Sequence, residues 1–266
     1  KSKKIIIKVG KNSVTTDLKH KEKPSKRKLK NIYLYFFNFL MIHFLFIFLP
    51  NIILSDLSLY IDITFINEGL HKFLSDEYKG VFPDKIYINY KEQELYNNNS
   101  IFINNSLDIV RLEWENTLPD FSYMFSNLLD IINISVYYML SSSANLSHQF
   151  NNCKNLKNII FKGSLTYPND TRKMFYNCQS IIDLNLDNII NTNNVEDMSF
   201  MFYNCKKLEN LKIKNFTNEL TINMRGLFMN CEQLETLNLD RFYTPNVEVM
   251  WDMFNGCRKL INLSLS

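Results

Sequence analysis

Residues 195–213 read VEDMSFMFYNCKKLENLKI, and residues 247–265 read VEVMWDMFNGCRKLINLSL. Both contain the pattern F-x-x-C-x-x-L-x-x-L-x-L, in which Ile can replace Leu. The pattern occurs five times, and its Phe positions lie 25, 27, 26 and 26 residues apart. Five copies at a nearly constant period indicate a repeat architecture, so this pattern decides the fold. The copies begin at Phe150, Phe175, Phe202, Phe228 and Phe254, and an earlier unit at Phe125 has Leu in the Cys position.

The first part of each repeat has a helical hydrophobic period. In the unit 195–213, the apolar residues Val195, Met198 and Met201 lie three apart, and Cys205 and Leu208 continue the series. This spacing is typical of one face of a short helix. We therefore predict a short helix in every repeat.

The second part of each repeat alternates apolar and polar residues. Leu211-x-Ile213 and Leu237-x-Leu239 show this alternation, which indicates a short strand because successive side chains of a strand point to opposite faces. No single unit can bury its apolar residues alone, whereas stacked units form a continuous core. A period of about 26 residues lies in the range of leucine-rich repeats. We therefore predict an α/β fold, a leucine-rich-repeat solenoid with one short helix and one short strand per repeat.

The stretches 195–213 and 247–265 resemble the BspA-type leucine-rich repeats of microbial surface proteins. They match the family pattern V-x-x-M-x-x-M-F-x-x-C-x-x-L-x-x-L-x-L almost position by position. The resemblance extends from about Ile109 to Ser266; it departs from the pattern at Gln149, where Met is usual, and in the missing Cys of the first unit. It implies a secreted or cell-surface protein that acts in recognition or adhesion and has no catalytic activity.

The N-terminal part of the chain has a different composition. Residues 1–30 hold twelve Lys or Arg against two acidic residues, a balance of +10. Residues 31–266 hold eighteen against twenty-five, a balance of −7, and the whole chain carries +3. We predict that residues 1–30 form a basic, disordered head. The acidic remainder argues against a nucleic-acid-binding protein.

An uncharged hydrophobic stretch follows the basic head. Ile32–Leu49 is 18 residues long without a charge, which is enough for a helix to cross the ~30 Å of hydrocarbon in a bilayer. Basic residues before such a helix keep the head in the cytoplasm. We therefore predict an N-terminal hydrophobic helix within residues 31–55, either a cleaved signal peptide or an uncleaved membrane anchor. Either one places the rest of the chain outside the cytosol.

Residues 56–110 separate the hydrophobic stretch from the repeats. Leu57–Phe65, Ile86–Tyr90 and Ile109–Trp114 have the composition and alternation of strands. We predict a small β cap over residues 56–110 that shields the open edge of the first repeat. Residues 111–266 then form the solenoid. The chain stops inside a repeat strand without a polar capping unit, so we expect the solenoid to be truncated at this end.

The five cysteines all occupy one repeat position. Stacking aligns them in a column, which favours a ladder of buried thiols; a disulfide bridge between neighbouring repeats is the alternative. No cysteine has a second one within four residues, and no catalytic triad, phosphate loop or zinc spacing occurs. We therefore predict no enzyme, no cofactor and no metal. His148 occupies a variable repeat position and is expected at the surface.

The outward-facing strand residues predict the surface that a partner contacts, because solenoids usually bind through their concave strand face. This face is polar, carries charges of both signs and has no exposed aromatic residue, which suits a protein or glycan ligand. The candidate partner-binding residues are Asp183, Asn185, Asp187, Asn210, Lys212, Lys214, Thr236, Asn238 and Asp240.

The chain contains thirty-six Asn, an excess that we attribute mostly to an A/T-rich coding sequence. Seven Asn-x-Ser/Thr motifs occur, and Asn98 and Asn169, in predicted loops, are the candidate glycosylation sites.

We predict a membrane-associated cell-surface or secreted protein that mediates recognition or adhesion. The alternative is an intracellular leucine-rich-repeat scaffold for protein–protein interaction, in which Ile32–Leu49 packs internally.

Overall fold

The computed structural model describes residues 4–9, 12–17, 59–94, 99–138, 144–163, 167–187, 190–214 and 216–264. The chain separates into two units, Lys1–Asp56 and Leu57–Ser266. In the first unit, strands β1 (Lys4–Val9) and β2 (Asn12–Asp17) pair antiparallel inside the basic head. The hydrophobic helix predicted at Ile32–Leu49 lies outside the described residues. Within the described residues, no helix has the length and apolarity that a membrane crossing requires.

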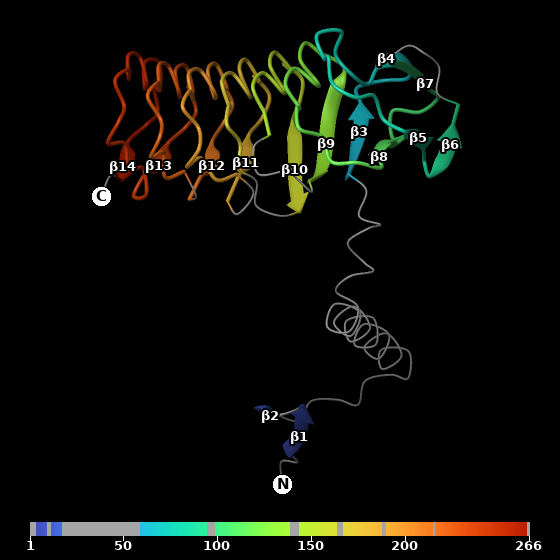
Figure 1. Cartoon of the computed structure of the whole chain (residues 1–266), viewed down its shortest axis with the longest axis horizontal. Helices are drawn as coiled ribbons and strands as arrows, with labels where there is room; N and C mark the ends of the chain where they lie inside the picture. The colour runs from blue at the N-terminus through green and yellow to red at the C-terminus, as the bar shows by residue number, and fades with distance from the viewer. Residues whose placement is uncertain are drawn as a thin grey trace. The chain divides into compact units, whose positions relative to one another are not determined.

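A six-stranded sheet joins the cap to the first two repeats (Figure 1). Its strand order is β10–β9–β3–β8–β5–β6. The cap supplies β3 (Leu59–Phe65), β5 (Lys85–Ile88), β6 (Lys91–Gln93) and β8 (Val110–Trp114), and the repeats supply β9 (Ile131–Tyr138) and β10 (Asn158–Gly163). β3 runs antiparallel to β8 and β9, whereas β9 and β10 are parallel. The cap therefore continues the sheet of the repeats by direct strand pairing. A separate antiparallel pair, β4 (Gly69–Lys72) and β7 (Ser100–Ile103), completes the cap.

Each later repeat contributes one short strand. These strands are β11 (Asp183–Asn185), β12 (Asn210–Lys212), β13 (Thr236–Asn238) and β14 (Asn262–Ser264). They pair in parallel as β11–β12 and β13–β14, and Figure 1 shows the repeats side by side in chain order. We call each stacked repeat a rung and name it by its repeat Phe. The predicted stacking of repeats with one strand each is confirmed.

The short helix predicted in each repeat is wrong, because the described residues contain no helix. In the rung of Phe202, the backbone amides alternate between two kinds of partner. Met201 and Tyr203 donate three residues back, to the carbonyls of Met198 (3.2 Å) and Phe200 (3.1 Å). Phe200 and Phe202 donate instead to carbonyls of the next rung, at 2.9 and 3.0 Å. The segment is a ribbon of consecutive turns, so the described fold consists of strands and turns and is not α/β.

Two residues with positive φ per rung explain why no helix forms. They lie two residues before and two residues after the repeat Phe, for example Phe200 (φ 57°) and Asn204 (φ 59°). An α-helix needs negative φ at every position, so each of these residues ends one turn and starts another. Asn is among the residues that adopt this left-handed conformation most easily. The second position is held by Asn127, Asn152, Asn177, Asn204 and Asn230, and by Gly256 in the last rung.

The asparagines at this second position also form a hydrogen-bonded ladder along the stack. Asn152 donates to the side-chain oxygen of Asn127 (2.7 Å), Asn177 to Asn152 (2.6 Å) and Asn204 to Asn177 (2.5 Å). The ladder ends in the cap, where Asn127 donates to the Glu77 carboxylate at 3.0 Å. Coding bias therefore does not account for these asparagines, which have a structural role.

The core is built from columns of identical side chains. The six repeat phenylalanines stack with ring centroids 5.5 to 5.7 Å apart. Each cysteine thiol donates to the carbonyl of the Phe one rung earlier, at 2.9 to 3.2 Å. All five cysteines are free; four are buried and Cys257 is half-buried. The predicted thiol ladder is confirmed, and the alternative of a disulfide between rungs is not.

Candidate recognition surface

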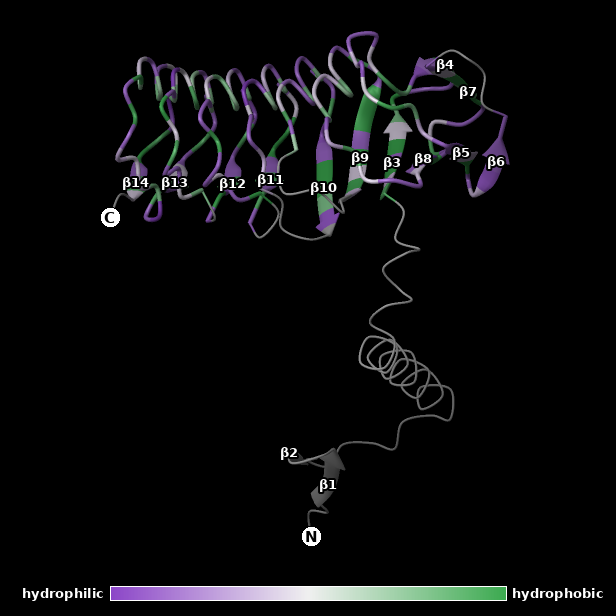
Figure 2. Ribbon diagram, viewed as in Figure 1, coloured by the Kyte–Doolittle hydropathy of each residue, from purple (hydrophilic) through white to green (hydrophobic). Residues whose placement is uncertain are grey.

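The outward-facing side chains of β9 to β14, together with those of the described residues up to three positions after β11, β12 and β13, form one surface, which we call the strand face. In β11 and β13 one buried residue lies between two exposed ones, as expected for strands with one buried and one outward side. The longer strand β10 is hydrophobic in its middle and hydrophilic toward its ends (Figure 2). Eight of the nine predicted partner-binding residues are exposed on this face, and Asp187 is half-exposed. Strand pairing places Asp183 beside Asn210 and Asn185 beside Lys212. The nine residues therefore lie in rows across three neighbouring rungs.

The carboxylates of the strand face are hydrogen-bonded within it. Asp183 accepts a bond from the Asn210 amide group, and Asp187 accepts one from the backbone amide of Lys214, both at 2.6 Å. The ammonium groups of Lys212 and Lys214 form no ion pair among the described residues. The carboxylates keep their negative charge, but their oxygens are engaged by donors of the face, whereas the two ammonium groups are not engaged in ion pairs among the described residues.

A hollow of about 460 Å³ opens where β12 and β13 end. Its wall includes three of the predicted residues, Lys214, Asn238 and Asp240. Its fourth polar residue, Arg241, is exposed and has no ion pair among the residues that the structure describes. The sequence interpretation missed Arg241 because it follows the strand, outside the alternating pattern. The remaining lining residues are Ile213, Phe216, Leu239 and Phe242.

An aromatic cluster extends the strand face onto the cap. The half-exposed rings of Tyr60 in β3 and Tyr137 in β9 stack with centroids 4.0 Å apart. The Arg111 guanidinium lies 4.2 Å from the Tyr60 centroid, and the Lys162 ammonium lies 4.8 Å from that of Tyr137. The prediction of a face without aromatic residues concerns only the strands from Asp183 onward and does not include this part of the sheet. Sequence alone could not pair Tyr60 with Tyr137, because the two strands meet only in the folded sheet.

Hydrogen bonds fix the aromatic cluster. Arg111 donates to both carboxylate oxygens of Asp62, at 2.7 and 2.9 Å, and this contact raises the pKa of the guanidinium. Burial, together with a hydrogen bond to Tyr137, raises the pKa of Tyr60 to about 12. Lys162 donates to the Tyr137 hydroxyl at 2.8 Å. The cluster therefore presents two stacked phenol rings, one beside the Arg111 guanidinium and the other beside the Lys162 ammonium.

The two candidate glycosylation sites differ in what the structure says of them. Asn98 lies outside the described residues. Asn169 is exposed, whereas Thr171, which completes its Asn-x-Thr motif, is fully buried. Glycosylation at Asn169 therefore stays a prediction.

The chemistry of the titratable groups follows from their burial. Burial raises the pKa of the Cys153 and Cys205 thiols to about 12, so at neutral pH they are protonated and weakly nucleophilic.

No three His, Cys, Asp or Glu side chains of the described residues are grouped so that they could hold a metal ion. His148 is half-buried and stacks on Tyr123 with ring centroids 4.4 Å apart.

Comparison with known sequence families agrees with this architecture. Residues 87–181 match a family described as BspA type leucine rich repeat region (6 copies), and residues 169–266 match a family described as a Mycoplasma protein of unknown function, DUF285. No curated protein and no solved structure matches the chain. The BspA-type match indicates a repeat protein with a role in protein interaction or at the surface. The resemblance expected from the sequence is thus confirmed for residues 87–181, which are similar to BspA-type leucine-rich repeats, whereas the stretches 195–213 and 247–265 lie in the part that matches the Mycoplasma family.

Proposed function

We propose that the chain is a non-enzymatic, cell-surface or secreted recognition protein that binds a protein or glycan partner through its strand face. The observation that supports this most directly is that the acidic groups of that face have bonding partners within the protein and its basic groups have no ion pairs among the described residues. Its carboxylates are hydrogen-bonded within the face, whereas Lys212, Lys214 and Arg241 lack ion pairs among the described residues. Lysine and arginine side chains without internal partners are available to bind acidic groups of a ligand.

The rigidity of the strand face also supports a binding role. Its side chains project from strands whose opposite side packs on the stacked Phe and Cys columns, for example Leu184 and Leu237, which are buried. A surface fixed before binding loses less conformational entropy when a partner docks. The long row of similar rungs suits an extended contact rather than a deep pocket.

A double charge reversal tests the strand face. We expect Lys212→Glu/Lys214→Glu to weaken retention of the full chain on immobilised extracellular matrix or on a glycan array by tenfold or more. A tenfold loss corresponds to about 1.4 kcal/mol, which is within the range for losing one or two charge-assisted contacts. The matched control is Lys206→Glu/Lys207→Glu, which changes the charge equally in the same repeat but at exposed residues before the strand.

The two variants give a clear decision. Weaker retention of the strand-face variant alone, with an unchanged far-ultraviolet circular dichroism spectrum, supports the proposal. Equal retention of both variants and the unmodified chain removes the strand face as the binding surface.

Localisation is tested separately. We expect a tag at the C-terminal end of the chain to be removed by protease added to intact cells, whereas a tag at the N-terminal end is protected in the anchored form. Protection of both tags would support the intracellular scaffold instead.

A further inference from the structure

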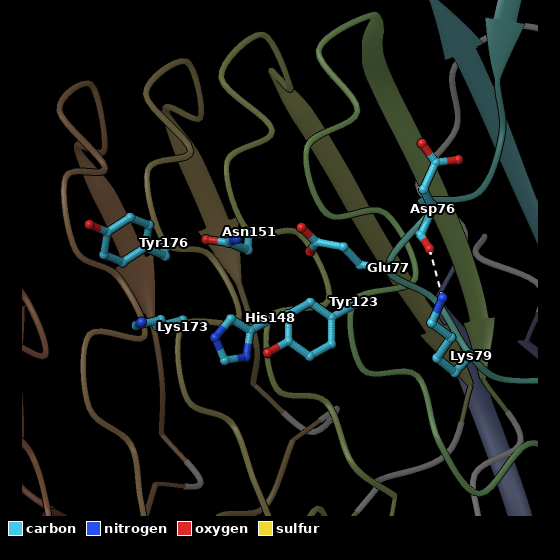
Figure 3. A pocket seen from close by; sticks show the side chains of 8 residues that line it. All are labelled: Asp76, Glu77, Lys79, Tyr123, His148, Asn151, Lys173 and Tyr176. Atoms are coloured by element: carbon cyan, nitrogen blue, oxygen red, sulfur yellow. Dashed lines mark hydrogen bonds between the residues drawn. The ribbon is translucent and has the colours of Figure 1, made fainter.

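A second hollow lies on the side of the rungs formed by the turns (Figure 3). It has a volume of about 670 Å³, and we call it the turn-face groove. The cap lines it with Asp76, Glu77 and Lys79, and three successive rungs line it with Tyr123, with His148 and Asn151, and with Lys173 and Tyr176. None of these residues belongs to the strand face, so the groove is a separate feature of the surface.

The two carboxylates of the groove are already engaged by the protein. Asp76 accepts hydrogen bonds from Lys72 and from Asn99, the latter at 3.0 Å. Glu77 accepts one from Asn127 at 3.0 Å and one from the Ser126 hydroxyl at 2.9 Å, where it ends the asparagine ladder. Asp76 is therefore ion-paired with Lys72, whereas Glu77 keeps its negative charge because both of its donors are neutral.

The two lysines of the groove, in contrast, form no ion pair among the residues that the structure describes. Lys79 donates only to the backbone carbonyl of Asp76, at 3.2 Å. The Lys173 ammonium lies 5.6 Å from the ring centroid of Tyr176. In Figure 3 the two lysines stand on opposite sides of the groove, with the ring of His148 between them.

The ring of His148 lies among charges of both signs. Burial lowers its pKa, and the charges of Lys173 and Arg172 lower it further, against the opposing effect of Asp170 and Glu77. Its Nδ1 atom is buried and has no hydrogen-bond partner in the described structure. An anion placed beside the ring favours the imidazolium form and therefore raises this pKa.

The groove suits a saccharide better than a peptide. A peptide that adds to a sheet needs free backbone groups, but the amides of Tyr123, His148 and Lys173 already donate to the next rung at 2.8 to 3.1 Å. No aliphatic side chain lines the groove, so it offers no apolar pocket for a peptide side chain. The groove instead presents phenol, imidazole, amide and ammonium groups, which hydrogen-bond to hydroxyl and acidic groups.

We propose that the turn-face groove is a second binding site, which holds an anionic glycan whose carboxylate or sulfate groups pair with Lys79 and Lys173. The site is independent of the strand face, so either one can be tested without the other.

The test uses nuclear magnetic resonance of the full chain, because the His148 signal reports on the groove and not on the basic head. The probes are a hyaluronan oligosaccharide for carboxylates, a heparin oligosaccharide for sulfates, neutral dextran and a polyglutamate peptide. We expect at least one charged saccharide to shift the assigned His148 signal and raise its pKa. In Lys79→Gln/Lys173→Gln, the Kd obtained from this shift should rise about tenfold, the loss of one or two charge-assisted contacts.

The matched control is Lys212→Gln/Lys214→Gln, which removes the same charge from the strand face and should change this Kd by less than about twofold. The response to the two charged saccharides identifies which acidic group the groove prefers. Absence of a His148 shift with both saccharides overturns the proposal. An equal loss of affinity in both variants, or an equal response to dextran or to polyglutamate, also overturns it.

Discussion

Replacing Asn177 by Ala should destabilise the chain through two separable effects. The backbone of Asn177 has φ 62°, its side chain donates to Asn152 at 2.6 Å, and its oxygen accepts from Asn204 and from Gln179, both at 2.5 Å. Ala disfavours positive φ by roughly 1 kcal/mol, and the three half-exposed side-chain hydrogen bonds contribute about 1 kcal/mol together. We therefore expect the free energy of unfolding to fall by about 2 kcal/mol.

Glycine at the same position separates the backbone effect from the hydrogen bonds. Asn177→Gly loses the same hydrogen bonds but adopts positive φ without steric cost, so it should be more stable than Asn177→Ala by about 0.5–1 kcal/mol. The matched control is Asn246, an exposed residue outside the set with positive φ. Its side chain makes one hydrogen bond, to the carbonyl of Glu219 at 2.8 Å. At Asn246 the order should reverse, with Ala more stable than Gly.

Urea unfolding of the full chain, followed by circular dichroism, measures these differences if the slope of the transition stays the same in all variants. If Asn177→Gly proves no more stable than Asn177→Ala, the argument that this position is selected for its backbone conformation fails. If both Asn177 variants match the unmodified chain, the asparagine ladder contributes nothing to stability.

Two further predictions concern buried and paired groups. The free energy of unfolding should be highest below about pH 8.5, the ordinary pKa of a thiol, and should fall between that pH and about pH 12. In this range the unfolded chain releases thiol protons that Cys153 and Cys205 retain in the folded chain, because their pKa values are about 12. Urea midpoints measured from pH 7 to pH 11 test this, and a Cys153→Ala/Cys205→Ala variant that declines as steeply as the unmodified chain would contradict it. Arg111→Lys should cost about 1 kcal/mol, because lysine cannot keep both bonds to Asp62 and the contact with Tyr60. Arg258→Lys, at an exposed pair with Glu232, is the control in the same urea assay and should have no measurable effect; equal losses in both variants would refute the reasoning.

The repeat period and the buried positions could be predicted from the sequence because stacking requires the same residue at the same place in every rung. Val195, Met198, Met201 and Cys205 are buried as the pattern indicated. The helix that the same residues suggested does not form. A ribbon of turns returns to the core every three or four residues, so its apolar spacing imitates that of a helix.

The signal that distinguishes the two structures was present in the sequence. Asn recurs two residues after the repeat Phe in every unit but the last, and this position has positive φ. A helix interior does not favour Asn. Attributing the asparagines to coding bias removed this signal from the interpretation. A second signal is the Asp or Asn five residues before every repeat Phe except Phe254, where Val249 stands. Its side chain accepts from the backbone two residues later, as Asp197 does from Ser199 at 2.7 Å.

The candidate surface was predictable only where it follows the repeat. The nine predicted partner-binding residues follow from alternation inside each unit and lie together on the strand face, six in the strands and three just after them. Tyr60, Arg111 and the turn-face groove depend on the cap, whose strands pair with the repeats across long stretches of sequence. Such pairing has no local signal, since alternation shows which residues share a face but not which strand lies next to it.

The backbone amides of the turns donate alternately within their own rung and to the next rung. This pattern affects how such a molecule can change in evolution. Each rung offers the next one the same set of donors and acceptors, at nearly the same positions, along the whole series from Phe125 to Phe254. A duplicated unit inserted between two rungs finds matching partners on both sides, whereas a partial unit leaves amides unsatisfied. Gene duplication can therefore lengthen the strand face in whole rungs while the cross-section stays constant.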